Sequence, residues 1–217
     1  MEANTVHSKV KEIKQSFRLM MDGAVAQSMR DKGVNYHLNW GATIPRLQAK
    51  ADEIRSKVEG RRSKGELYDL AIALYKENVR ECKILASMLM PADEILPEVV
   101  DIWQEQIPSQ EIAEQLAFNL YQHLPFAAEK AYQWIASDKE YDQLCGFHIL
   151  SRLFMNGQEP NERGINEYLD QALCALQGPY PAVRKAALQS VQRFAELGLL
   201  YERLAKSAMK SIDLDIF

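Results

Sequence analysis

The chain has 217 residues, of which 47% are hydrophobic and 26% charged, and its formal net charge is -4. These proportions exclude a disordered chain and a low-complexity polymer, and at this length we expect a single domain over residues 1–217. The sequence has neither a run of about 18 apolar residues nor an apolar leader, so we expect a cytoplasmic protein without a membrane span.

Helical periodicity runs along nearly the whole chain. Apolar residues recur at spacings of three and four, as at Leu67, Leu70, Ala71 and Leu74, which is typical of amphipathic helices. No segment alternates with period two for long enough to predict a strand. Prolines and capping residues divide the pattern into predicted helices over residues 6–31, 44–59, 64–77, 79–90, 92–106, 109–123, 125–137, 138–155, 162–177, 181–197 and 199–212.

The cysteines and histidines show no spacing typical of a disulfide framework or of a zinc site. We therefore expect no metal and no cofactor. Cys82, Cys145 and Cys174 all lie in apolar helical patterns, so we expect each to be a small buried side chain. The sequence also lacks a Ser-His-Asp or Cys-His arrangement, a Gly-rich phosphate loop and a dinucleotide-binding fingerprint.

Small residues recur near the start of four predicted helices. They are Cys82, Ala113, Cys145 and Ala186, at intervals of 31, 32 and 41 residues. A small side chain at this point lets a neighbouring helix approach closely, and stacked helix pairs then bury a continuous core. The pattern predicts an all-α fold, an α-solenoid of antiparallel helix pairs. A four-helix bundle is the second interpretation, because it needs fewer and longer helices.

The repeat segments resemble the AlkD-like DNA alkylation repair family, whose members are DNA glycosylases built from HEAT-like repeats. The resemblance extends over residues 15–197. It implies an alpha-alpha superhelix of HEAT-like pairs with a concave face for DNA. It is carried by residues 29–46, 70–75 and 79–89, by the helices that start at Ser109 and Tyr141, and by residues 183–187.

In the resembled family a Trp-Asp-x-x-Asp run, an Arg on the next repeat and a second Trp carry the chemistry. The resemblance implies that a carboxylate stabilises an oxocarbenium ion while an alkylated purine is released. It makes Glu111 and Glu114 the candidate catalytic residues. Where the family has its other groups, this chain has Gln110, Tyr141, Gln143, Leu144 and Gln189. Of these, Gln110, Tyr141 and Gln189 are candidates for the nucleic-acid-binding face.

Charge is distributed unevenly along the chain. Residues 44–65 carry seven basic and three acidic side chains, whereas residues 90–142 carry two basic and eleven acidic ones. Phosphate binding requires Lys and Arg gathered along one face. The candidate DNA contacts are Arg46, Arg55, Arg61, Arg62, Arg184 and Lys185.

Three functions remain open from the sequence. The protein could bind DNA without releasing bases, could keep a residual N-glycosylase activity through Glu114, or could be a protein–protein scaffold whose acidic central repeats face a basic partner. Glu111 and Glu114 also fit a structural role, because acidic residues in a first turn favour the helix dipole. Two roles are open for the cluster of Tyr36 and Trp40 as well, namely packing of Trp40 under the first repeat or stacking on a base.

Overall fold

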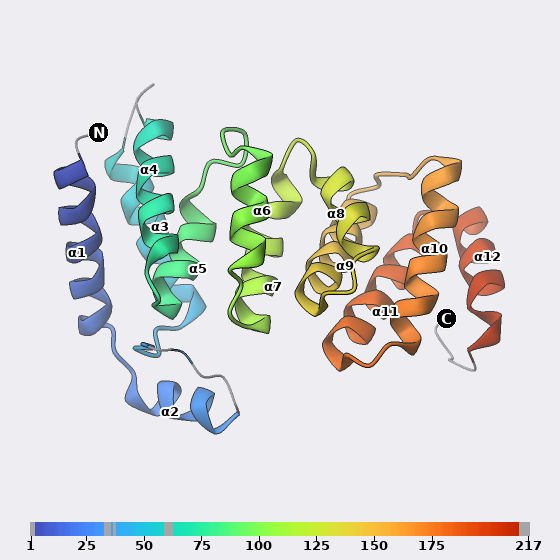
Figure 1. Cartoon of the computed structure of the whole chain (residues 1–217), viewed down its shortest axis with the longest axis horizontal. Helices are drawn as coiled ribbons and strands as arrows, with labels where there is room; N and C mark the ends of the chain where they lie inside the picture. The colour runs from blue at the N-terminus through green and yellow to red at the C-terminus, as the bar shows by residue number, and fades with distance from the viewer. Residues whose placement is uncertain (1–2, 33–35, 37, 59–62, 213–217) are drawn as a thin grey trace. The chain divides into compact units, whose positions relative to one another are not determined.

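The computed structural model describes residues 3–32, 36, 38–58 and 63–212. This part of the chain is helical and contains no β-strand, apart from an isolated parallel bridge between Leu38 and Val79 (Figure 1). The helices are α1 (Ala3–Leu19), α2 (Gly23–Asp31), α3 (Ile44–Lys57), α4 (Ser63–Lys76), α5 (Arg80–Leu89), α6 (Pro97–Glu105), α7 (Gln110–Asn119), η1 (Tyr121–His123), α8 (Ala127–Ile135), α9 (Glu140–Met155), α10 (Glu162–Gln177), α11 (Pro181–Ala195), α12 (Leu199–Ala208) and η2 (Met209–Ser211). The prediction of an all-α fold is confirmed.

The chain forms two compact units, residues 1–120 and residues 121–217. We call them the N-terminal unit, which holds α1 to α7, and the C-terminal unit, which holds η1, α8 to α12 and η2. In the N-terminal unit α5 packs against α3, α4 and α7. In the C-terminal unit α9 packs against α8 and α11, and α11 also packs against α10 and α12.

The small residues that define the repeat all lie in the core. Cys82, Ala113, Cys145 and Ala186 are all buried. They lie on α5, α7, α9 and α11, which pack as α5 on α7 and as α9 on α11 within their units. Gly146 marks a close approach of α9 to α8, because a Cβ at this position would lie 2.7 Å from Cγ2 of Ile135. All four residues therefore belong to the core, and their role in close approach of the paired helices stays a prediction.

The predicted helix over residues 6–31 is wrong as a single element. The chain leaves α1 after Leu19, and Asp22 then caps α2 by accepting bonds from the backbone N–H groups of Ala24 and Val25. A carboxylate that caps a helix start competes with continuation of the preceding helix. The segment predicted as helix from residue 92 likewise becomes helical only at Pro97.

The burial predicted for the cysteines is wrong at one position, whereas the packing predicted for Trp40 is correct. Cys82 and Cys145 are buried, whereas Cys174 on α10 is exposed, so its predicted burial is wrong. Trp40 is buried and lies with its ring 5.9 Å from that of Phe17 on α1. The packing role of Trp40 is therefore confirmed.

Candidate nucleic-acid interface

Glu111 lies in the first turn of α7, where the resemblance places a catalytic carboxylate. Ser109 caps this helix, with its Oγ accepting a bond from the backbone N–H of Ile112. Both oxygens of Glu111 face Arg80 at the start of α5. Oε1 lies 2.6 Å from Nη2 of Arg80 and Oε2 lies 2.8 Å from its Nε. A two-bond pairing of this kind is the strongest geometry available to an arginine and a carboxylate.

Arg80 is almost fully enclosed, with 1% of its surface exposed. Besides Glu111, it contacts the carboxylate of Glu81 at 3.3 Å and donates to the carbonyl of Ala42 at 2.8 Å. Burial would lower the pKa of Arg80, but the bonds from Glu111 and the charges of Glu111 and Glu81 outweigh burial and raise it. The guanidinium is therefore charged, and each of its three nitrogens has a hydrogen-bond acceptor.

The loop before α3 joins the same group of side chains. The hydroxyl of Tyr36 donates to Oε2 of Glu111 and lies equally close, at 2.7 Å, to Oγ of Ser109. Oε1 of Glu81 accepts the backbone N–H groups of Trp40 and Ala42. We call Tyr36, Arg80, Glu81, Ser109 and Glu111 the Arg80 network.

A glycine makes the loop's path possible. Gly41 has a φ of 75°, and a Cβ there would lie 2.2 Å from the carbonyl oxygen of Asp22. Only a residue without a side chain fits this close approach. The loop is therefore pressed between the start of α2 and the Arg80 network.

The electrostatics of Glu111 favour its charged form. Burial would raise the pKa of Glu111, but the bonds and the charge of Arg80, together with the bond from Tyr36, lower it overall. With 25% of its side chain exposed and each oxygen bonded, Glu111 has a structural task in this arrangement. Burial and the charge of Glu111 in turn raise the pKa of Tyr36.

Glu114 lies one turn further along α7 and does not join the network. Its Oε1 accepts a bond of 2.8 Å from Nε2 of Gln110, and Gln110 itself is exposed. Glu114 is half-buried. The residues that correspond to the family's first motif are thus split between a buried ionic network and a solvent-facing pair.

The predicted DNA contacts of the N-terminal unit gather on α3. Arg46 is exposed and donates to the carbonyl of Met20 at 3.1 Å. Arg55 pairs with Asp52 at 3.0 Å and also contacts the carbonyl of Met88. The other two predicted contacts, Arg61 and Arg62, lie outside the described residues.

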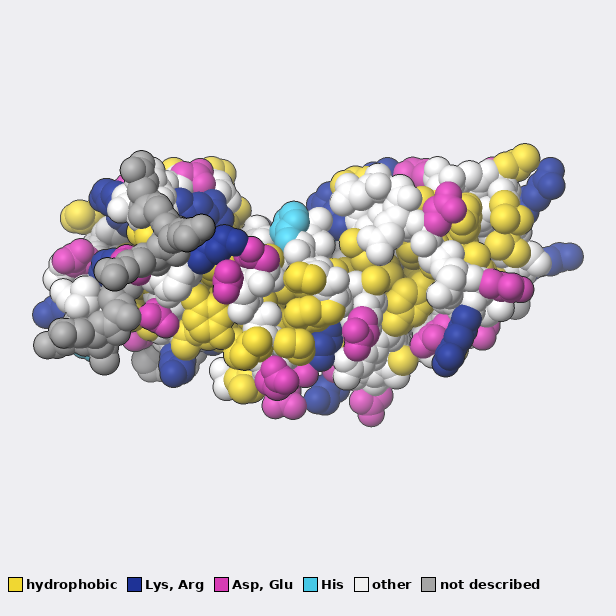
Figure 2. Space-filling model, turned by 90° about the horizontal axis from the view of Figure 1, so that it is seen from above, with side chains coloured by type: hydrophobic (Ala, Val, Ile, Leu, Met, Phe, Trp, Pro, Cys, Tyr) yellow, Lys and Arg dark blue, Asp and Glu magenta, His cyan; other side chains and the backbone are white. Residues whose placement is uncertain are grey.

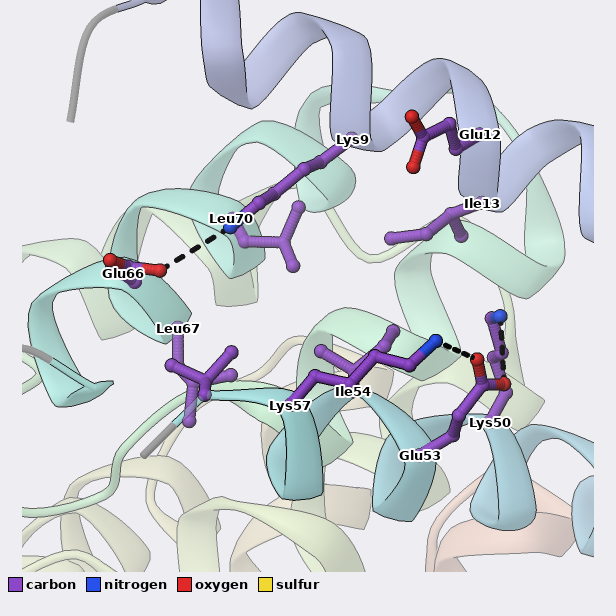
Figure 3. Close-up of a pocket in the computed structure, with 11 residues that line it drawn as sticks. Lys9, Glu12, Ile13, Lys50, Glu53, Ile54, Lys57, Glu66, Leu67 and Leu70 are labelled. Carbon is purple, nitrogen blue, oxygen red and sulfur yellow. Dashed lines mark hydrogen bonds and ion pairs between the residues drawn. The ribbon is translucent and has the colours of Figure 1, made fainter. Parts of the chain in front are cut away.

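Other lysines near α3 are already paired with carboxylates. They surround a cavity of about 270 Å³ between α1, α3 and α4 whose floor is apolar (Figure 3). Lys50 and Lys57 both pair with Glu53, at 2.9 and 2.5 Å, and Lys9 pairs with Glu66 at 3.3 Å. Bonds from Lys57 and Lys50 lower the pKa of Glu53 to about 2.

Mixed charge is also visible on the surface of the N-terminal unit. In the left part of Figure 2, Lys and Arg side chains lie beside Asp and Glu side chains. Ion pairs of Lys50 and Lys57 with Glu53, and of Arg55 with Asp52, partly compensate the excess of basic residues in 44–65.

The predicted nucleic-acid-binding residues of the C-terminal unit lie on α9 and α11, two helices that pack together. Tyr141 is half-buried in the first turn of α9, while Lys185 and Gln189 are exposed one turn apart on α11. Arg184 donates to the carbonyl of Gly178 at 2.7 Å. Burial and the charge of Glu140 raise the pKa of Tyr141.

The sequence did not indicate that His148 and Arg152 on α9 lie near the predicted contact Lys185 on α11. His148 on α9 is buried, and burial followed by the charges of Arg152 and Lys185 lowers its pKa to about 4. Lys185 on α11 therefore lies close enough to α9 for its charge to act on His148. The spacing could have revealed the α9 part of this arrangement, because His148 and Arg152 follow Tyr141 by seven and eleven residues and so lie on one helix face.

In the described ranges, no group of three or more His, Cys, Asp or Glu side chains is placed to hold a metal ion. Nor is any helix there long and apolar enough to span a bilayer.

Comparisons with known proteins agree with this architecture. Residues 13–187 match the family described as DNA alkylation repair enzyme. The fold is also similar to a solved structure described as "A new family of proteins related to the HEAT-like repeat DNA glycosylases with affinity for branched DNA structures", with a TM-score of 0.75 and 15% identity over 93% of this chain and 82% of that chain. At this identity the likeness shows a HEAT-like repeat fold. No curated protein matches the sequence. The family match covers most of the chain, and the protein therefore belongs to the DNA alkylation repair enzyme family.

Proposed function

We propose that this protein binds DNA and does not release alkylated bases through Glu111. The observation that carries the proposal is the pairing of both Glu111 oxygens with Arg80, and of one of them with Tyr36. A carboxylate that stabilises an oxocarbenium ion must face the sugar, with its charge uncompensated along that direction. Glu111 would have to break its bonds to a buried guanidinium before it could act in this way.

Loss of the other family groups supports the same proposal. Gln110 in the N-terminal unit and Gln189 in the C-terminal unit stand where the family has its tryptophans, and a glutamine provides neither a large stacking surface nor a positive charge. Glu114 keeps a carboxylate at the second acidic position, but Gln110 bonds to it. The alternative to this proposal is residual base release that depends on Glu114.

DNA binding is supported by the family and by the related fold. The proteins of the similar solved structure are described as having affinity for branched DNA. We assign the phosphate contacts of this chain to Arg46, Arg55, Arg61 and Arg62 in the N-terminal unit, and to Arg184 and Lys185 in the C-terminal unit. Lys185 is the first candidate to test in the C-terminal unit, because its side chain is exposed.

The binding test is a fluorescence anisotropy titration of labelled duplex DNA and of a four-way DNA junction, at 50 and 200 mM salt. Several phosphate contacts should weaken binding by a factor of ten or more between these salt concentrations. Lys185→Gln should lower the salt slope by about one, whereas the matched control Lys210→Gln, also exposed in the C-terminal unit, should not. Absent or salt-independent binding would overturn the proposal.

The catalytic test measures release of free base from duplex DNA that contains N-methylpurines. We expect no release above the uncatalysed rate. Release by the unchanged protein that disappears in Glu114→Gln would instead establish a residual glycosylase. Release that persists in Glu114→Gln would assign catalysis to another group.

An interaction scaffold is the second candidate, favoured by the surface of α6. Leu96 and Ile102 expose 58% and 52% of their surfaces, and the acidic residues Glu98 and Glu105 beside them are exposed as well. Such a mixed surface would suit a basic, amphipathic partner. Failure to bind DNA combined with saturable binding of a Lys-rich amphipathic peptide, lost in Ile102→Ser, would favour the scaffold.

A further inference from the structure

A stripe of basic side chains runs along α1 in the N-terminal unit. His7, Lys11, Lys14 and Arg18 follow each other at spacings of four, three and four residues, so they share one face of the helix. We call these four residues the α1 stripe. They were not among the predicted contacts, although their spacing is readable in the sequence.

The packing of α1 keeps the stripe outside the core. Val10, Ile13 and Phe17 are buried, and α1 packs against α4. The apolar face holds the helix in place, and Lys11 and Arg18 remain exposed. The positions of the basic groups along the helix are therefore set before any partner binds.

Most of the stripe's charge is uncompensated. Lys14 pairs with Glu77 at 2.7 Å. Neither Lys11 nor Arg18 forms an ion pair within the part of the chain that the structure describes. On the other face of α1, Lys9 is neutralised by Glu66 (Figure 3). The two faces of α1 thus differ in the positive charge that is available to a ligand.

A cavity of about 320 Å³ lies along the stripe. Its lining includes all four stripe residues, with Leu38 and Trp40 as an apolar part and Glu77 as the acidic residue among the lining side chains. Cationic groups beside a small apolar surface suit a sugar–phosphate unit, whose phosphate is anionic and whose deoxyribose is largely apolar.

We infer that the α1 stripe binds the sugar–phosphate backbone of DNA. The inference rests on the proposed DNA-binding function and adds a contact surface to it. At a rise of 1.5 Å per residue, His7 and Arg18 lie about 16 Å apart along the helix axis, and the phosphates of one strand advance about 3.4 Å each along a duplex. The stripe is long enough to contact several phosphates of one strand and reads no base sequence.

The test compares two double variants that remove the same charge from the same unit. Lys11→Gln/Arg18→Gln removes two unpaired cations from the stripe. Lys9→Gln/Lys57→Gln removes two cations that pair with Glu66 and Glu53 around the other cavity. Anisotropy titrations with a duplex and a four-way junction between 50 and 300 mM salt give the affinity and the salt slope of each protein.

We expect the stripe variant to bind both DNAs 10- to 100-fold more weakly near 0.1 M salt, with a salt slope lower by about two, because each phosphate contact contributes close to 0.9 to the slope. The control variant should change affinity less than threefold. Equal losses in the two variants would overturn the inference and leave DNA binding intact, since they would report net charge alone. If the unchanged protein does not bind DNA, both this inference and the proposed DNA-binding function are overturned. Matching thermal unfolding of the three proteins checks that each is folded.

Discussion

Two regions of the N-terminal unit use positive charge in opposite ways. In the Arg80 network, one buried guanidinium is matched by two carboxylates and a backbone carbonyl. On the α1 stripe, Lys11 and Arg18 are exposed and unmatched among the described residues. Burial forces a charge to find partners, because an unpaired ion is costly away from water. The Lys and Arg content of a segment therefore does not tell how much charge a phosphate can meet.

The largest expected effect comes from breaking the buried pair. Arg80→Met should lower the free energy of unfolding by about 3–5 kcal/mol, because it leaves the fully buried Glu81 and the partly buried Glu111 without their cation. Urea unfolding followed by circular dichroism measures the loss. Arg18→Met on the α1 stripe is the matched control and should change stability by less than about 0.5 kcal/mol. Similar losses in the two variants would remove the distinction between the regions.

A smaller effect is expected from the anionic side of the pair. Glu111→Gln should lower the free energy of unfolding by about 2 kcal/mol at pH 7, since it replaces charge-assisted bonds by neutral ones. The folded state lowers the pKa of Glu111, so this contribution is complete above the ordinary carboxyl pKa and is lost as the pH falls through the lower folded value.

The measurement is the difference in unfolding free energy between the unchanged protein and Glu111→Gln from pH 7 down to pH 3. That difference should shrink on acidification. Protonation of His148 between about pH 6.5 and 4 also lowers the stability of the folded protein. This effect is the same in both proteins, so it cancels in the difference between their unfolding free energies. A difference that does not vary with pH would show that the Glu111 charge adds nothing to folding.

The loop's attachment to the network predicts a loss of about 1 kcal/mol in Tyr36→Phe. The change removes one hydroxyl, which bonds to Glu111 and Ser109, and keeps the aromatic ring. Chemical denaturation measures the loss, and Tyr68→Phe on α4 serves as the control for removal of a phenol. A stability equal to that of the unchanged protein would show that the loop is held by Glu81 and packing alone.

The smallest expected effect comes from freeing surface lysines that are paired with a carboxylate. Glu53→Gln releases Lys50 and Lys57 from their common carboxylate and should raise the affinity for DNA by severalfold at 50 mM salt. Glu202→Gln, on α12 of the C-terminal unit, changes the net charge equally. Equal gains in the two variants would mean that α3 does not face the bound DNA.

Much of the fold was predictable because its signals are local. The spacing of apolar residues predicted the helices, and the recurrence of Cys82, Ala113, Cys145 and Ala186 predicted that helix pairs repeat along the chain. Errors arose where a local competitor decided the outcome, as at Asp22, whose carboxylate caps α2 and ends a helical pattern that otherwise continues. The exposure of Cys174 was missed because residues of one apolar pattern can lie at the edge of the buried face.

The candidate site was less predictable, because it depends on residues far apart in the chain. The sequence alone determined that carboxylates stand at Glu111 and Glu114 and that the stripe of α1 is basic. Only the tertiary structure decided that Glu111 meets Arg80 and Tyr36, 31 and 75 residues away, while Lys11 and Arg18 meet no carboxylate among the described residues. Composition and periodicity depend on neighbours along the chain, whereas the partner of a charge depends on which helices pack together and how far each side chain is removed from water.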